Sequence, residues 1–188
     1  MRLRDLIAGF GLAVVLGAGS MSANAAESEY TPIALDQCQA LPIDPDDPLQ
    51  SGGWACAGYL GVPVLIWESD LRFFVSYGVL GASQPAANET LPPFNYINDT
   101  LEWRLDDAGA PIATILRFFA ETGDGGPETQ VLVVTRLRDD GGVCHIAYVN
   151  ASANPAANEL ARQAADLIAA NFTCGFHVPI WIGDRGGL

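Results

Sequence analysis

Lysine is absent from this chain, and all nine of its basic residues are arginines. The chain also contains 22 aspartates and glutamates, so that its formal net charge is −13. A chain this acidic repels the phosphates of nucleic acids and of anionic lipids, and we expect neither as a partner. The same charge favours solubility and attracts a cationic partner.

Histidine is scarce, since the chain contains only His145 and His177. A serine or cysteine nucleophile needs a neighbouring base, so such an active site would have to use one of these two residues. No Gly-x-Ser-x-Gly motif follows residue 25. We therefore expect a binding protein without a cofactor rather than an enzyme. A small exported hydrolase that uses His145 or His177 is the alternative.

Long apolar runs are lacking after the first 25 residues. Two arginines precede the apolar run 6–18, and the small residues 23–25 provide a cleavage site. This pattern is typical of a secretory signal at 1–25, with cleavage after Ala25 or, alternatively, after Ala26. The run is short for a spanning helix, and an uncleaved anchor is the other interpretation. We expect a periplasmic or secreted protein with no membrane span once the signal is removed.

Cysteine occurs only four times, as Cys38, Cys56, Cys144 and Cys174. In an oxidising compartment four cysteines predict two disulfides. Spacing favours Cys38–Cys56 and Cys144–Cys174, and the two other pairings stay open. Cys144 and Cys174 also resemble zinc ligands when taken with His145 and His177. We expect no metal, because adjacent strand residues such as Cys144 and His145 point to opposite faces.

Short apolar segments separated by Gly, Pro, Asn and Asp predict about seven strands. They span residues 54–59, 62–67, 71–77, 100–105, 112–119, 130–138 and 143–149. Residues 26–52 have few periodic apolar positions and are expected to form an N-terminal arm before an α+β domain at 53–188. The stretch 78–99 reads as a long loop, either a crossover between two parts of the sheet or a functional loop. The apolar segment 178–182 is expected to pack on the domain or to add an edge strand.

One long helix is predicted near the C-terminus. Asn154 is a suitable N-cap and Pro155 suits the first helical position. Apolar residues recur at helical spacing and define one face, which comprises Leu160, Ala164, Leu167, Ile168 and Phe172. On the other face Arg162 is spaced to reach Glu159 and Asp166. Strands first and a helix last indicate a single α+β domain, with an antiparallel, curved sheet and the C-terminal helix packed on it.

A Cys144–Cys174 disulfide would also fix which way the side chains of the last strand point. Cys144 would face the helix, with Ile146 and Tyr148 beside it. His145 would then point to the opposite face, together with Val143, Ala147 and Val149.

Arginines recur within the predicted strands, at Arg72, Arg104, Arg117, Arg136 and Arg138. Arg136 and Arg138 share a face by alternation, and Arg104 and Arg117 on neighbouring strands can join them. Guanidinium groups bind carboxylates and phosphates in a bidentate manner. These arginines, with His145, therefore form a predicted site for a small anionic ligand, centred on Arg117, Arg136 and His145. The alternative is that each arginine pairs with a cross-strand carboxylate and lies over an aromatic ring.

Two other features point to binding. The segment Asp44-Pro45-Asp46-Asp47-Pro48 forms a stiff acidic loop that lacks the spacing of a calcium loop. Such a loop suits a cationic protein, and the protein would then act as an inhibitor of a basic secreted enzyme such as a lysozyme. The aromatic residues Trp54, Tyr59, Trp67 and Tyr77 would form either a surface for a sugar or a peptide, or part of the core. A structural role in the cell envelope is a further alternative to binding.

Overall fold

The computed structural model describes residues 26–43, 45–122, 125–138 and 142–187. The expected signal segment, 1–25, lies outside the described residues, and so does Asp44 of the acidic loop. In the part of the chain that is described, no helix is both long enough and apolar enough to cross a membrane.

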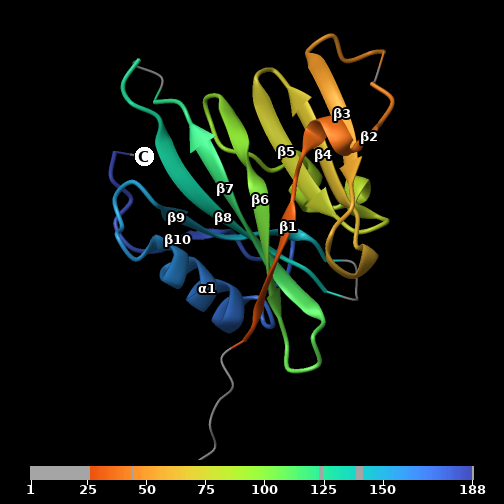
Figure 1. Cartoon of the computed structure of the whole chain (residues 1–188). Helices are drawn as coiled ribbons and strands as arrows, with labels where there is room; N and C mark the ends of the chain where they lie inside the picture. The colour runs from red at the N-terminus through yellow and green to blue at the C-terminus, as the bar shows by residue number, and fades with distance from the viewer. Residues whose placement is uncertain (1–25, 44, 123–124, 139–141, 188) are drawn as a thin grey trace, which may run out of the picture.

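The domain consists of two sheets and one helix, in three layers (Figure 1). The larger sheet contains, in spatial order, β1 (Ser28–Pro32), β6 (Asn95–Leu105), β7 (Pro111–Ala120), β8 (Thr129–Arg136), β9 (Cys144–Asn150) and β10 (Ile180–Trp181). The smaller sheet contains β2 (Gln39–Ala40), β3 (Gln50–Cys56), β4 (Val64–Ser69) and β5 (Arg72–Tyr77). Helix α1 (Ala157–Ile168) lies against the larger sheet, and Figure 1 shows the smaller sheet on the other side. The predicted α+β class with a C-terminal helix packed on a sheet is confirmed.

Each of the seven predicted strands overlaps one of the strands β3–β9, and the apolar tail contributes β10. All neighbouring strands are antiparallel except β9 and β10, which run parallel, so that the larger sheet is mixed. The segment 26–52, expected to be an arm, forms β1, β2 and the start of β3. β1 is short, polar and ends at Pro32, which suits an edge strand that is paired on one side only.

Alternation along the central strands produces two apolar faces. One face packs against the smaller sheet through Leu101, Trp103, Leu116, Phe118, Val131 and Val133. The other packs against α1 through Ala113, Ile115, Leu132 and Val134. The helix buries small side chains there, namely Ala157, Ala161, Ala164 and Ala165. A core on both faces explains why β7 and β8 read as nearly continuous apolar runs.

The details of α1 differ from the prediction. The helix begins at Ala157, and no described side chain caps its N-terminus. Asn154 instead donates from Nδ2 to the carbonyls of Asn150 (2.8 Å) and Asp184 (2.7 Å), which fastens the C-terminal tail. Leu167, expected on the buried face, is 76% exposed. The predicted N-cap and the predicted burial of Leu167 are therefore wrong.

A bulge in β9 changes the predicted side-chain directions. Val134 pairs with Ala147 but Thr135 pairs with His145, so that Ile146 has no partner residue on β8. Cys144 and Ile146 face α1 as predicted. Beyond the bulge, Ala147 and Val149 also face α1 and Tyr148 faces the inter-sheet core, which is the reverse of the prediction.

Both predicted disulfides are present, Cys38–Cys56 and Cys144–Cys174. The first ties the segment before β2 to the end of β3, and the second ties β9 to the segment after α1. In the chain-entropy model, loops of these lengths stabilise the fold by roughly 3–4 kcal/mol each. Two disulfides indicate an oxidising environment outside the cytoplasm.

The predicted long loop, 78–99, connects the two sheets and contains the short 3-10 turns η3 (Gly81–Ser83) and η4 (Pro85–Asn88) before β6 begins. It also closes the outer edge of β9. The Ala86 N–H donates to the Val143 carbonyl (3.1 Å), and the Glu89 carboxylate accepts from the His145 N–H (2.6 Å). We call residues 78–94 the crossover.

Candidate functional site

The strand register brings several predicted arginines to one face of the larger sheet. Arg104 and Arg136 both pair with Ala113 of β7, from opposite sides, and so lie in one row across three strands. Arg117 lies further along β7 on the same face by alternation. Helix α1 covers this face, so the row borders the helix rather than open solvent.

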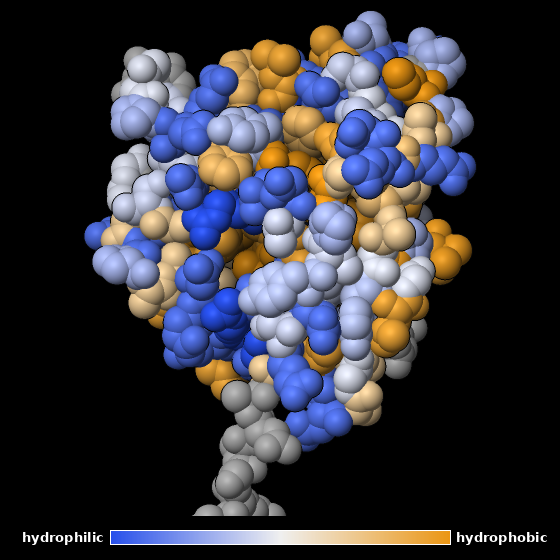
Figure 2. All heavy atoms as spheres, in the orientation of Figure 1, coloured by the Kyte–Doolittle hydropathy of each residue, from blue (hydrophilic) through white to orange (hydrophobic). Residues whose placement is uncertain are grey.

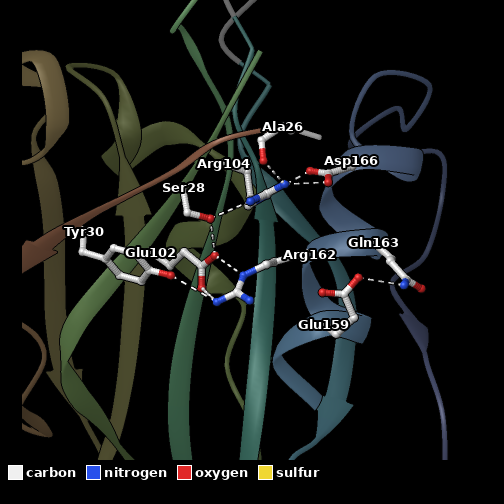
Figure 3. Close-up of polar contacts among 9 residues, drawn as sticks. All are labelled: Ala26, Ser28, Tyr30, Glu102, Arg104, Glu159, Arg162, Gln163 and Asp166. Atoms are coloured by element: carbon white, nitrogen blue, oxygen red, sulfur yellow. Dashed lines mark hydrogen bonds and ion pairs between the residues drawn. The ribbon is translucent and has the colours of Figure 1, made fainter. Parts of the chain in front are cut away.

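Arg104 belongs to a buried network that joins β1, β6 and α1 (Figure 3). Its Nε and Nη2 donate to the two oxygens of the Asp166 carboxylate (2.9 and 2.6 Å). Its Nη1 donates to Ser28 Oγ (2.5 Å), and its Nη2 makes a second bond, to the Ala26 carbonyl (2.6 Å). The Arg104 side chain is almost fully buried, with a residue exposure of 4%. All three nitrogens of this guanidinium therefore already donate to oxygens of the protein.

The network continues from Ser28 to Arg162. Ser28 Oγ donates to the Glu102 carboxylate (2.5 Å), which also accepts from Arg162 Nε (2.6 Å). Arg162 donates in addition from Nη2 to the Tyr30 hydroxyl (3.1 Å). The hydrogen bond to Glu102 raises the pKa of Arg162 above its usual range. Figure 2 shows hydrophilic side chains gathered over this part of the visible face, beside α1 and β1. The predicted pairing of Arg162 with Glu159 and Asp166 is wrong, because Arg162 binds Glu102 and Asp166 binds Arg104.

The other predicted arginines also have acceptors in the protein. Arg136 donates to the carbonyls of Ala169 and Gly142 (3.0 Å each), and Arg138 donates to the Ala170 carbonyl (2.8 Å). Carbonyls at the C-terminal end of a helix attract cations, so the bonds to Ala169 and Ala170 complement the helix dipole. Arg117 bonds to the amide oxygens of Gln130 and Asn158, and Arg72 pairs with Asp70 (2.6 Å). Anion binding by these arginines stays a prediction, and an anion would have to displace the bonds described.

His145 lies on the opposite face of the sheet from the arginine row and is 1% exposed. Its predicted position on an outer surface is wrong, because the crossover and the smaller sheet cover that face. Its Nδ1 lies 3.0 Å from the Tyr148 hydroxyl, and burial lowers the pKa of His145 to about 3, so that the ring is neutral at physiological pH. A substrate cannot reach such a ring directly, and the hydrolase alternative would therefore depend on His177.

His177 lies in the exposed segment after α1. Its Nδ1 accepts a hydrogen bond from the Thr173 N–H (2.8 Å), and the rings of Phe172 and Phe176 lie beside it. Cys144 and Cys174, which could have served as zinc ligands together with His145 and His177, are joined in a disulfide. Over residues 26–187, apart from the few positions that are not described, no three or more His, Cys, Asp or Glu side chains are grouped to hold a metal.

The predicted aromatic set divides between the two faces of the smaller sheet. Trp54, Tyr59 and Tyr77 contribute to the inter-sheet core, where Tyr77 packs edge-on against Trp103. Trp67 lies on the outer face, directly opposite Phe74 of β5 in the strand register. Both rings are half-buried. Gly53 pairs with Trp67 from the other side and has no side chain of its own to cover the indole, although the side chains of Leu41 and Gln50 lie near this position.

Trp67 and Phe74 form part of an open groove with a volume of about 610 Å³. One wall comes from the segment before β3 and the other from the crossover. The first wall includes Pro42, Ile43 and Pro45, and the second includes Ala82, Ala87 and Asn88. Asp47, Gln50 and Ser69 add polar groups at one end. We call this the outer groove.

The outer groove is acidic at its polar end. Asp47 is held in place because its carboxylate accepts from the Leu49 N–H (3.0 Å) and from Ser69 Oγ (3.2 Å). In the neighbouring β4–β5 turn, Asp70 is paired with Arg72 (2.6 Å) and so adds no net charge beside the groove. A cationic group in the groove would therefore meet a fixed carboxylate and two aromatic rings.

The sequence indicated Trp67 and the acidic loop as two separate features, and it did not indicate that Phe74 and Asn88 line the same groove. The strand pattern could have indicated Phe74, because Trp67 and Phe74 alternate with the buried Ile66 and Val75.

No protein-family model, curated protein or solved structure matches the chain.

Proposed function

We propose that the protein is an exported, non-enzymatic binding module that holds a cationic segment of another protein in the outer groove. The observation that carries this proposal is the open Trp67–Phe74 pair with the fixed Asp47 carboxylate at its end. A basic secreted enzyme, such as a lysozyme, is the kind of partner that fits. The protein would meet it in the periplasm or outside the cell.

A lysine or arginine side chain suits this groove in two ways. Its aliphatic part can lie along an aromatic floor while its charged end reaches a carboxylate. A cation over an indole or phenyl ring contributes about 0.5–2 kcal/mol, depending on how far it is desolvated. Asp47 supplies the opposite charge, and its two hydrogen bonds to Leu49 and Ser69 limit its motion before the ligand arrives.

The overall charge supports the same partner. With a net charge of −13, the protein attracts a cationic protein over a distance and speeds their encounter, most strongly at low salt. A small anion at the arginine face is the weaker candidate, since α1 covers that face and the guanidinium groups are bonded to protein oxygens.

Titration calorimetry with a capped hexa-arginine peptide and with a basic lysozyme tests the proposal. We expect binding that weakens as sodium chloride rises, and an affinity at least tenfold lower for Asp47→Asn and Trp67→Ala. Asp107→Asn is the matched control, because it removes the same charge from an exposed turn between β6 and β7. Absence of binding by the peptide, or an equal loss in Asp107→Asn, would overturn the proposal, since equal loss means attraction by net charge alone.

A further inference from the structure

A second, smaller pocket lies between the crossover and the C-terminal tail, at one end of the inter-sheet core. Its volume is about 270 Å³. The apolar part of its lining comes from Leu91, Ala120 and Val131. The rings of Tyr148 and Trp181 add an aromatic part, and Arg185 lies at the tail side. We call it the Arg185 pocket.

Arg185 differs from the other arginines of the described chain. The guanidinium groups of Arg72, Arg104, Arg117, Arg136, Arg138 and Arg162 all donate to oxygens of the protein. Arg185 lies over the Trp181 ring, 5.1 Å from its centroid, and makes no ion pair with any residue that the structure describes. Its guanidinium donates to no oxygen of the described residues, and is therefore available to an external anion.

The tail holds Arg185 in position through its backbone. The Arg185 carbonyl accepts from Asn150 Nδ2 (2.8 Å), and the Asp184 carbonyl accepts from Asn154 Nδ2 (2.7 Å). The Asp184 carboxylate accepts from the Gly186 N–H (2.9 Å) and so belongs to the turn itself. The site therefore does not depend on a loose end of the chain.

The aromatic side of the pocket is also built. Trp181 packs on Tyr148, with ring centroids 5.2 Å apart, and the Tyr148 hydroxyl is bonded to His145 Nδ1. Burial, and next the charge of Glu89, raises the pKa of Tyr148 well above its usual range, so that the phenol stays uncharged. Glu89 itself accepts the His145 N–H (2.6 Å). Tyr148 thus presents a neutral ring to the pocket.

We propose that the Arg185 pocket binds a small apolar monocarboxylate, with its apolar body against Leu91 and Val131 and its carboxylate on Arg185. Drug-sized ligands occupy pockets of about 300–1,000 Å³, so a volume below that range indicates a smaller molecule such as a medium-chain fatty acid. Bidentate bonding of a carboxylate to a guanidinium supplies the recognition of charge. This inference does not rest on the proposed function, which concerns a cation and a different sheet.

Octanoate is the probe, and octanamide is the matched neutral control. We expect octanoate to bind and octanamide to bind at least tenfold more weakly. Arg185→Gln should remove most of this difference, whereas Arg117→Gln, on the arginine face, should leave octanoate binding unchanged. Binding is followed by the methyl resonances of Leu91 and Val131, which should shift on addition of octanoate.

Four results would overturn the inference. Equal binding of octanoate and octanamide would show that Arg185 does not select an anion. Loss of octanoate binding in Arg117→Gln would assign the anion to the arginine face. Shifts confined to the exposed apolar residues Leu167 and Val178 would place octanoate on a different surface. Absence of any binding would contradict it equally.

Discussion

Arg104 and Asp166 form a two-point ion pair that joins β6 to α1, with Nε–Oδ1 and Nη2–Oδ2 distances of 2.9 and 2.6 Å. Arg104 is nearly inaccessible to water, so loss of its partner would leave a buried charge. We therefore expect Asp166→Ala to lower the free energy of unfolding by about 2–4 kcal/mol, somewhat less than for a fully buried pair because Asp166 is partly exposed.

Urea denaturation measures this effect. Glu159→Ala is the control, because Glu159 is exposed on the same helix and its side chain bonds to Gln163. That substitution should change stability by less than about 0.5 kcal/mol. Equal effects of the two substitutions would mean that the Arg104–Asp166 pair does not hold the helix to the sheet.

Leu167 provides a test of which helix face is buried. Since its side chain is largely exposed, Leu167→Ala should change the free energy of unfolding by less than about 0.5 kcal/mol. Ala161, six residues earlier, is fully buried against the sheet, and Ala161→Leu should lower the free energy of unfolding by about 1–3 kcal/mol through overpacking. Urea denaturation midpoints measure both effects. A larger loss of stability in Leu167→Ala than in Ala161→Leu would support the helix face predicted from the sequence instead.

His145 makes stability depend on pH. Its pKa is about 3 in the folded protein against 6.5 when unfolded, so the unfolded chain binds a proton that the folded protein does not. Stability is therefore full above pH 6.5 and should fall as the pH drops from 6.5 toward 3, by up to about 1.4 kcal/mol per pH unit. Burial raises the pKa of Glu89, and this shift has the opposite effect, because it favours the folded state as the pH falls.

Thermal unfolding between pH 7 and pH 5 measures the slope. His145→Asn keeps a hydrogen-bonding group near Tyr148 but cannot be protonated, and it should flatten the profile. An unchanged slope in this variant would mean that another group is responsible.

The two disulfides predict a definite mass change. Denatured protein should gain four hydrogens on reduction, two for each disulfide. The double substitution Cys144→Ser/Cys174→Ser should lower the free energy of unfolding by about 2–4 kcal/mol. Free thiols in protein isolated from its native source with thiols trapped would contradict the assignment of an oxidising environment.

Strands β3–β9 and both disulfides could be predicted from the sequence, because turn residues separate short apolar segments and the cysteine spacing favours local pairs. β1 could not, since a polar edge strand of the sequence Ser-Glu-Tyr-Thr-Pro carries no apolar alternation. The faces to which Ala147 and Tyr148 point could not be predicted, because they depend on the bulge at Ile146. No residue type near Ile146 indicates that bulge.

The candidate site was only partly predictable. The shared face of Arg104, Arg117 and Arg136 followed from alternation, but the sequence did not show that α1 would cover this face and supply acceptors such as Asp166 and the Ala169 carbonyl. The outer face of Trp67 and Phe74 could be read from the same alternation. The placement of Asp47 beside Trp67 depends on the fold of the loop before β3, which no periodic pattern reports.

The most direct test of the account follows the indole N–H resonances of Trp54, Trp67, Trp103 and Trp181 while capped hexa-arginine is added. Trp67→Phe assigns the resonance of Trp67. The outer groove predicts that the Trp67 signal moves, that the other three stay in place, and that Asp47→Asn raises the required peptide concentration at least tenfold. A spectrum in which Trp67 does not move, or in which Trp181 moves instead, would contradict the proposal that the outer groove binds a cationic segment.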